Sequence, residues 1–308
     1  MEHGLFHLPR HQAVAVDGVD NPFQHDELVH LVMSFLSVDS IAQSRRVCKR
    51  WNVIGDKVVY SNAKEFTSNQ ELRTAVRHYC HTNTNRAESC KVRCEYGYPI
   101  GKWKVSKVTD FSCVFRNRHE FNEPIGLWNT SQVTTMESMF FGASFFNQNL
   151  AGWDTSQVTT MAYMFHGPSA SSFNQSLAGW DTSQVTNMEA MFCGASSFNQ
   201  SLAGWDTSQV TTMRGMFWGA SSFNQSLAGW DTSQVTIMEC MFKDARSFNQ
   251  SLAGWDTSQV TNMSYMLWDA SSFNQSLAGW DTRQVTTMEC MFSGASSFNQ
   301  SLAGWDTS

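Results

Sequence analysis

The chain lacks the segments that would carry it into or across a membrane. Residues 1–10 (MEHGLFHLPR) contain no apolar core of the kind that a signal peptide needs. No apolar run in the 308 residues is long enough to span a bilayer as a helix. We therefore expect an intracellular protein, in the cytoplasm or nucleus, that makes no contact with membranes.

Lysine and arginine are scarce after residue 110. Residues 111–308 hold 6 Lys and Arg against 15 Asp and Glu, a net charge of −9, whereas residues 1–110 hold 15 against 12, a net charge of +3. Nucleic acid binding needs clustered positive charge to neutralise phosphates, so we expect none in the acidic part. A basic protein partner would instead be attracted to it.

Signatures of catalysis are also missing. The sequence has no G-x-S-x-G, no glycine-rich phosphate loop and no H-E-x-x-H. His166 and Cys193 lie in neighbouring repeats, but no third group is placed to orient the histidine. Cys240 and Cys290 occupy the same slot two repeats apart, about 10 Å at the spacing of stacked strands, which is too far for a disulfide. We expect reduced thiols, no metal or cofactor, and no enzymatic activity.

The dominant feature that is present is a 25-residue repeat. Tryptophan recurs every 25 residues from Trp128 to Trp305, with a single step of 27 where residues 166–170 carry an insertion. The unit reads F-N-Q-S-L-A-G-W-D-T-S-Q-V-T-x-M-x-x-M-F-x-G-A-S-S. A fixed period of this length is typical of a solenoid, in which each repeat forms one coil stacked on its neighbours. We assign the solenoid to residues 100–308, with 100–124 as a degenerate first repeat and the C-terminus in mid-repeat.

Each coil is expected to combine a short parallel strand with a helix of one to two turns, giving an α/β solenoid of about eight to nine coils. Residues 201–208 are the expected strand. Residues 210–219 are the expected helix, because their apolar positions recur at i, i+3 and i+4. Seven large apolar residues per coil would form the core, as in Phe198, Leu202, Trp205, Val210, Met213, Met216 and Phe217.

The ends of these helices carry capping signals. A threonine with a glutamate three residues later predicts a capping box, as in Thr134/Glu137, Thr186/Glu189, Thr236/Glu239 and Thr286/Glu289. Gly219 and its equivalents stand where a helix takes a left-handed C-terminal residue. Asp244 and Asp269 replace that glycine in two coils, and a less regular exit is expected there.

Two polar residues also recur in every coil. The asparagine after the core phenylalanine is expected to bond the backbone of an adjacent coil; the alternative is glycosylation, since it begins an N-Q-S sequon. The aspartate after the tryptophan is expected to accept hydrogen bonds from the Thr-Ser turn that follows. The alternative is a column of calcium sites, although each coil lacks the further oxygen ligands that Ca²⁺ requires. Asn174, Asn199, Asn224, Asn249, Asn274 and Asn299 form the first column, and Asp154, Asp181, Asp206, Asp231, Asp256, Asp281 and Asp306 form the second.

The slots that vary between coils lie around the M-x-x-M-F-x segment and are expected to face solvent. Several of them hold aromatic residues, and exposed aromatics often anchor partner proteins. The alternative is that a solvated face tolerates any residue. The candidate target-binding residues are Phe141, Tyr163, His166, Trp218, Lys243, Tyr265 and Trp268.

The repeat resembles the BspA-like surface-repeat family, a mycoplasma-type domain of unknown function with the unit W-D-V-S-x-V-T-x-M-x-x-M-F-x-G-A-x-x-F-N-Q. The resemblance covers about two thirds of the chain. It implies a leucine-rich-repeat-like solenoid. It implies little about activity, because the bacterial members are mostly cell-surface or adhesion proteins.

Residues 22–62 predict a small all-α module, with an amphipathic helix at 26–36 and a second helix at 41–51. The pattern D-E-L-x-x-x-V-x-x-F-L-x-x-x-x-I-x-x-x-R-x-V-C-K-R-W resembles the F-box family. Gln24 and His25 stand where that family usually has a Leu-Pro pair of the adaptor contact. The resemblance implies docking on the Skp-type adaptor of a cullin-RING ubiquitin ligase. The residues implied in that contact are Leu28, Val32, Phe35, Leu36, Ile41, Val47 and Trp51.

The remaining segments are a disordered N-terminus at residues 1–21 and a helical linker at 63–99, with a helix expected at 71–80. A zinc site is one interpretation of the linker's histidines and cysteines; an ordinary polar linker explains them equally well. The residues concerned are His78, Cys80, His81, Cys90 and Cys94.

An F-box followed by a solenoid is the layout of a non-catalytic substrate receptor of an SCF-type ligase, in which one end binds the ligase and the other an unknown, basic target protein. The alternative is a structural or adhesion rod with the helical module as its cap.

Overall fold

The computed structural model describes residues 63–80, 86–167 and 171–306. The chain divides into two units, Met1–Asn62 and Ala63–Ser308, and the description below concerns the second. That unit contains the helices α4 (Asn69–Cys80) and α5 (Arg86–Tyr96) and the 3₁₀ turn η1 (Ile100–Lys102). No helix in the described part of the chain is long and apolar enough to span a membrane.

The helix expected at residues 71–80 is present as α4. It begins beside Ser68, whose hydroxyl accepts the N–H of Glu71 at 3.3 Å. Its buried residues have helical spacing and form one face: Leu72, Ala75, Val76 and Tyr79.

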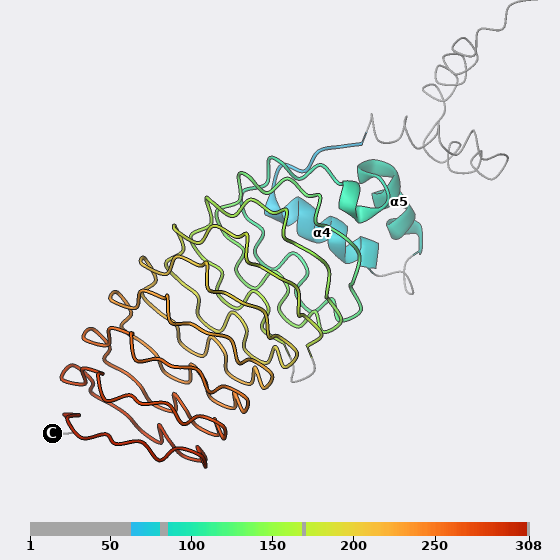
Figure 1. Ribbon diagram of the computed structural model, residues 1–308. Helices are drawn as coiled ribbons and strands as arrows, with labels where there is room; N and C mark the ends of the chain where they lie inside the picture. Colours follow the sequence, from blue (N-terminus) through green and yellow to red (C-terminus); the bar gives the residue numbers. More distant parts are fainter. Residues whose placement is uncertain (1–62, 81–85, 168–170, 307–308) are drawn as a thin grey trace, which may run out of the picture. The chain divides into compact units, whose positions relative to one another are not determined.

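From residue 100 onward the chain forms coils stacked along one axis (Figure 1). Equivalent residues of successive coils are joined by parallel bridges, one per step. The column runs Asp110, Thr135, Thr160, Asn187, Thr212, Ile237, Asn262 and Thr287. Each coil therefore lies in register with the next, as the 25-residue period predicts.

The helices predicted in the repeats are wrong: in the described residues, α-helix occurs only in α4 and α5. Within 210–219, alternate N–H groups donate to the next coil, from Gly215 to Glu239 at 2.8 Å and from Phe217 to Met241 at 2.9 Å. Gly215 and Gly219 have φ of 57° and 71°, so the segment bends in a series of tight turns. In this series of turns, residues three and four positions apart point into the core. The same spacing is typical of one face of a helix, which is why a helix was predicted.

The predicted capping boxes are therefore absent as well. The N–H and hydroxyl of Thr236 both donate to the carbonyl of Thr211 in the preceding coil, at 3.0 and 3.2 Å. The left-handed position after the segment is confirmed in Gly219. Asp244 and Asp269 adopt the same conformation, with φ of 58° and 54°, so the irregular exit expected there does not occur.

The strand predicted at residues 201–208 is also misplaced, because the bridge of this coil lies at Thr212. The N–H of Trp205 bonds the carbonyl of Leu202 at 3.1 Å, which closes a turn and brings both side chains into the core. Their spacing of three residues comes from this turn and not from an extended strand.

Aromatic columns fill the core along the solenoid. The rings of Trp205 and Trp230 stack with centroids 6.5 Å apart and planes 1° apart, and Trp103 of the degenerate repeat stacks on Trp128 in the same way at 6.5 Å. Each of these buried indoles also needs a hydrogen-bond acceptor. The Nε1–H of Trp205 donates to the carbonyl of Leu177 in the preceding coil, at 3.2 Å.

The two polar columns behave as expected from the sequence. The Oδ1 of Asn199 accepts the N–H of Asn224 at 3.0 Å and the amide of Gln225 at 2.9 Å. The Oδ1 of Asp206 accepts the N–H of Ser208 at 2.9 Å. The asparagine column therefore joins neighbouring coils, and the aspartate column stabilises a turn within each coil.

The two helices pack onto the N-terminal end of this core. Leu72, Tyr79 and Tyr96 belong to the same buried cluster as Trp103. The side-chain amide of Asn69 donates to the carbonyls of Asp110 and Ser112 at 3.0 and 2.9 Å. The helices α4 and α5, which belong to the expected linker, thus cover the first coil of the solenoid.

Candidate functional site

Some of the slots that vary between coils lie on the outer side of the tight turns, whereas others, such as Ala162, Ala190 and Cys193, are buried. In the coil of Met213 the core side is fully buried, whereas Arg214 and Trp218 are exposed. Because successive coils are in register, the equivalent side chains form one band, which we call the outer stripe. It contains all the candidate target-binding residues: Phe141, Tyr163, His166, Trp218, Lys243, Tyr265 and Trp268.

Lys243 is the centre of an aromatic cluster in the outer stripe. Its Nζ lies 4.7 Å from the ring centroid of Trp218 and 4.6 Å from that of Trp268. A cation over an aromatic face is attracted by the ring quadrupole. The indole of Trp218 also donates to Asp244 at 3.3 Å, and that of Trp268 to Asp269 at 2.9 Å. These contacts hold two large aromatic faces in fixed orientations on the surface, with Trp218 40% exposed.

A second cluster surrounds Phe141 nearer the N-terminal end. The ring of His166 stacks on it with centroids 4.5 Å apart, and the Arg116 guanidinium lies 4.4 Å from its centroid. Burial lowers the pKa of His166, which favours the neutral ring. Burial, and then the hydrogen bond that the hydroxyl donates to Glu189, raise the pKa of Tyr163 to about 12.

Beside the Lys243 cluster, in the same coils, the outer stripe is charged. Arg214 lies 3.5 Å from a carboxylate oxygen of Glu189 and 3.2 Å from one of Glu239. Exposed pairs of this kind contribute little to stability. They do alternate positive and negative groups along the band, so the outer stripe offers both aromatic and charged contacts to a partner.

The pair of His166 and Cys193 lacks the chemistry of a nucleophile and its base. Burial raises the pKa of the Cys193 thiol to about 12, so the thiol stays protonated at neutral pH. His166 stacks on Phe141. Nothing in this pair activates the sulfur.

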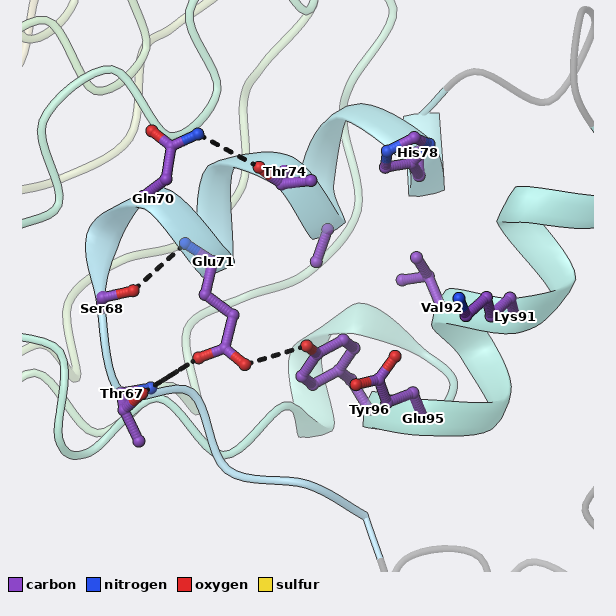
Figure 2. Close-up of a pocket in the computed structure, with 11 residues that line it drawn as sticks. Thr67, Ser68, Gln70, Glu71, Thr74, His78, Lys91, Val92, Glu95 and Tyr96 are labelled. Atoms are coloured by element: carbon purple, nitrogen blue, oxygen red, sulfur yellow. Dashed lines mark hydrogen bonds between the residues drawn. The ribbon is translucent and has the colours of Figure 1, made fainter.

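A hollow of about 630 Å³ lies between α4 and α5, and no sequence pattern predicts it. Figure 2 shows Glu71 and Tyr96 at its base, with Thr74 and His78 along α4 and Lys91 on α5. Its walls consist of polar and apolar groups from both helices, which meet only in the tertiary structure. A pattern within either helix therefore could not have indicated it.

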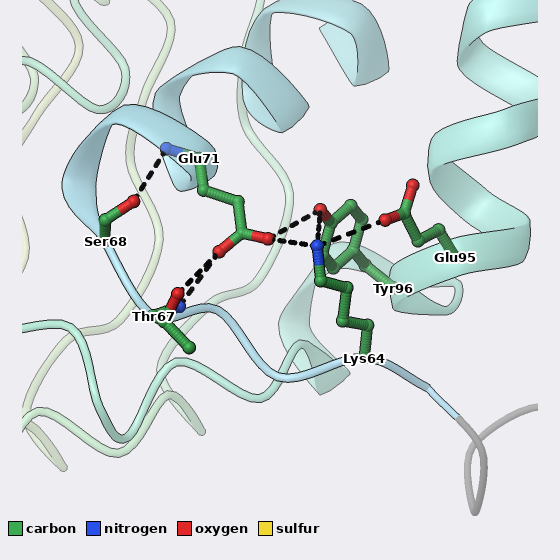
Figure 3. Close-up of polar contacts among 6 residues, drawn as sticks. All are labelled: Lys64, Thr67, Ser68, Glu71, Glu95 and Tyr96. Atoms are coloured by element: carbon green, nitrogen blue, oxygen red, sulfur yellow. Dashed lines mark hydrogen bonds and ion pairs between the residues drawn. The ribbon is translucent and has the colours of Figure 1, made fainter.

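Glu71 and Tyr96, at the base of this hollow, are bound to Lys64 from the segment before α4 (Figure 3). Lys64 Nζ lies 2.5 Å from Glu71, and the Tyr96 hydroxyl donates to Glu71 at 3.0 Å. Burial works against the charged carboxylate, but the hydrogen bonds from Lys64 and Thr67 prevail and hold the pKa of Glu71 at about 2. The network joins the segment before α4 to both helices, which is a structural task.

The residues implied in the adaptor contact all lie outside the described residues: Leu28, Val32, Phe35, Leu36, Ile41, Val47 and Trp51. Of the zinc candidates, His81 and the side chain of Cys90 also lie outside them, while Cys80 and Cys94 form no disulfide bond. Among the side chains that the structure describes, no three His, Cys, Asp or Glu gather in a way that could hold a metal ion.

Comparison with protein families identifies both parts of the chain. The family described as "Mycoplasma protein of unknown function, DUF285" matches at residues 87–203, 168–270 and 226–308. The F-box domain model matches at residues 25–60. No curated protein and no solved structure matches significantly.

The matches to the repeat family cover residues 87–308, so the chain belongs to the DUF285 family. An F-box domain precedes these repeats. Such a domain suggests binding to a Skp-type adaptor, and the function of the repeats is unknown.

Proposed function

We propose that this protein is a non-catalytic substrate receptor of an SCF-type cullin-RING ubiquitin ligase. The F-box match at residues 25–60 carries the proposal, because it supplies a ligase-binding domain in the same chain as a repeat surface. In this arrangement the F-box binds the Skp-type adaptor and the outer stripe binds the target protein.

The outer stripe supports the second half of the proposal. Interfaces are enriched in tryptophan, tyrosine and arginine, which supply large contact areas at low entropic cost. Trp218, Trp268 and Tyr265 are held around Lys243 by contacts within the chain, so a partner would meet an ordered surface. Such preorganisation favours binding, because less freedom is lost on association.

Adaptor binding is the first test. The full chain, its Leu36→Asp variant and its Trp51→Ala variant are each titrated with a purified Skp-type adaptor. We expect micromolar or tighter binding by the wild type and loss of binding in Leu36→Asp. Leu127→Asp is the matched control, because Leu127 lies in the repeats and is 90% exposed. A folded wild-type chain that does not bind the adaptor contradicts the proposal.

Target binding requires a separate test. Proteins captured by the wild type are compared quantitatively with those captured by Trp218→Ala and Trp268→Ala, with Phe145→Ala as the control for an exposed aromatic outside the outer stripe; Phe145 is 59% exposed. We expect a target that is lost in both tryptophan variants and retained in Leu36→Asp, since the F-box takes no part in target contact. A target retained by both tryptophan variants would remove the outer stripe from the proposal.

A further inference from the structure

Four arginines line one hollow at the N-terminal end of the solenoid, which is otherwise acidic. Arg73 and Arg77 come from α4, and Arg116 and Arg118 come from the coil that α4 covers. The hollow has a volume of about 230 Å³, and none of the described residues that line it is an Asp or Glu. In the sequence the two pairs are about 40 residues apart, so only the packing of α4 on the first coil brings them together.

Local structure orients both pairs toward this hollow. Gln70, Arg73, Thr74 and Arg77 are three and four residues apart, so they share one face of α4, and all four line the hollow. On the other side, the Arg116 guanidinium lies 4.4 Å from the ring centroid of Phe141. Stacking of this kind fixes the plane of the guanidinium while its N–H groups remain able to donate.

Arg116 and Arg118 stand out because they belong to the acidic part of the chain. Residues 111–308 have a net charge of −9, from 6 Lys and Arg against 15 Asp and Glu, yet two of those six basic residues lie in this hollow. Arg73, Arg77 and Arg116 repel one another in this small hollow, and an anion between them would lower that cost. Arginine donates in a planar fork that matches the oxygens of a phosphate, and a phosphorylated side chain carries nearly two charges.

We infer that this hollow, the arginine pocket, binds the phosphate group of a phosphorylated segment of the target protein. The identity of the partner rests on the proposed function; the anion site itself does not. A nucleic acid fits less well, because it carries a charge at every step and would extend onto an acidic surface. Glu120 and Glu123 already line the neighbouring hollow, which shares Asn117 and Arg118 with the arginine pocket. A single phosphate would bind in the arginine pocket, and the neutral or basic segment around it would not be repelled by Glu120 and Glu123 in the neighbouring hollow.

The test is a ³¹P NMR titration of the full chain with inorganic phosphate and with phosphoserine, at constant ionic strength. We expect saturable binding that weakens about tenfold or more in Arg73→Gln and in Arg116→Gln, since each variant loses a charge-assisted hydrogen bond. Arg73→Lys keeps the charge but loses the fork, and an intermediate loss is expected. Arg283→Gln is the control, because it removes the same charge from an exposed position where sister coils have serine.

Each remaining outcome decides against a part of the inference. Equal affinity in all variants, or no saturable binding by a folded wild type, overturns the pocket. Binding of free glutamate as tight as phosphoserine overturns the preference for phosphate. Tight binding of a labelled single-stranded oligonucleotide that depends on Arg73 and Arg116 assigns the pocket to nucleic acid. Adaptor binding is measured on the same variants: if it is absent in the wild type while phosphate binding persists, the proposed function fails and the anion site stands.

Discussion

The Oδ1 of Asn199 accepts the backbone N–H of Asn224, one coil further on, at 3.0 Å. The same oxygen accepts the amide of Gln225 at 2.9 Å. One side-chain oxygen thus joins two coils by accepting two hydrogen bonds. The column of asparagines repeats this contact along the solenoid. The recurrence of N-Q in the sequence is therefore explained by contacts between coils.

Replacement of Asn199 by alanine should lower the free energy of unfolding by about 1–3 kcal/mol, because it leaves the N–H of Asn224 without its acceptor. Urea unfolding, monitored by tryptophan fluorescence, measures the change. Gln225→Ala is the control, since it removes only the second donor and should cost less. If Asn199→Ala lowers the free energy of unfolding no more than Gln225→Ala does, the asparagine column does not join the coils.

Phe217→Ala should destabilise the protein by about 3–5 kcal/mol, because it leaves a cavity in a fully buried aromatic column. Phe217→Leu should cost much less. Leu267 already occupies the equivalent slot two coils on, where it is also fully buried. Chemical unfolding of both variants provides the measurement, and similar losses in the two would contradict the packing described here.

Gly219→Val should destabilise the protein by about 1–3 kcal/mol, since a β-branched residue is strained at the φ of 71° found there. Gly219→Asp should be better tolerated, because Asp244 and Asp269 adopt the same conformation in sister coils. A Cβ at this position would lie 3.5 Å from Gly194, an ordinary contact, so backbone strain and not crowding separates the two variants. Thermal midpoints of the two variants that coincide would refute this reason.

Acid should weaken the network at the base of the hollow between α4 and α5. The pKa of Glu71 is about 2 in the folded chain, against an ordinary value of 4.5. Its contribution to stability is therefore complete above the unfolded value and is lost as the pH falls from about 4.5 toward 2.

The thermal midpoint, measured as a function of pH, tests this directly. Wild type and Glu71→Gln should differ most at neutral pH, and the difference should shrink below pH 4.5. Glu120→Gln, at an exposed position of the first coil, controls for the loss of one negative charge. A difference that is constant across this range would mean that the ionised form of Glu71 does not stabilise the fold.

The sequence by itself determined the stacking, the period and the core. Residues such as Trp205, Leu202 and Met213 recur every 25 positions, and stacking of the coils buries them. The asparagine and aspartate columns followed from the same period. The candidate residues of the outer stripe were chosen because they vary within a strict repeat, but variation alone does not place a side chain outside, since the variable positions Ala162, Ala190 and Cys193 are buried.

Only the tertiary structure decided the backbone between those positions. The spacing of Met213, Met216 and Phe217 suits a helix face as well as a row of tight turns, and the choice falls to hydrogen bonds between coils, such as Gly215 to Glu239. The same holds for the arginine pocket, where Arg73 and Arg116 are brought together by packing. Local spacing records which side chains face inward. It does not show which distant backbone group each N–H will bond, which sets the turns, or which coil α4 will pack against, which sets the position of α4.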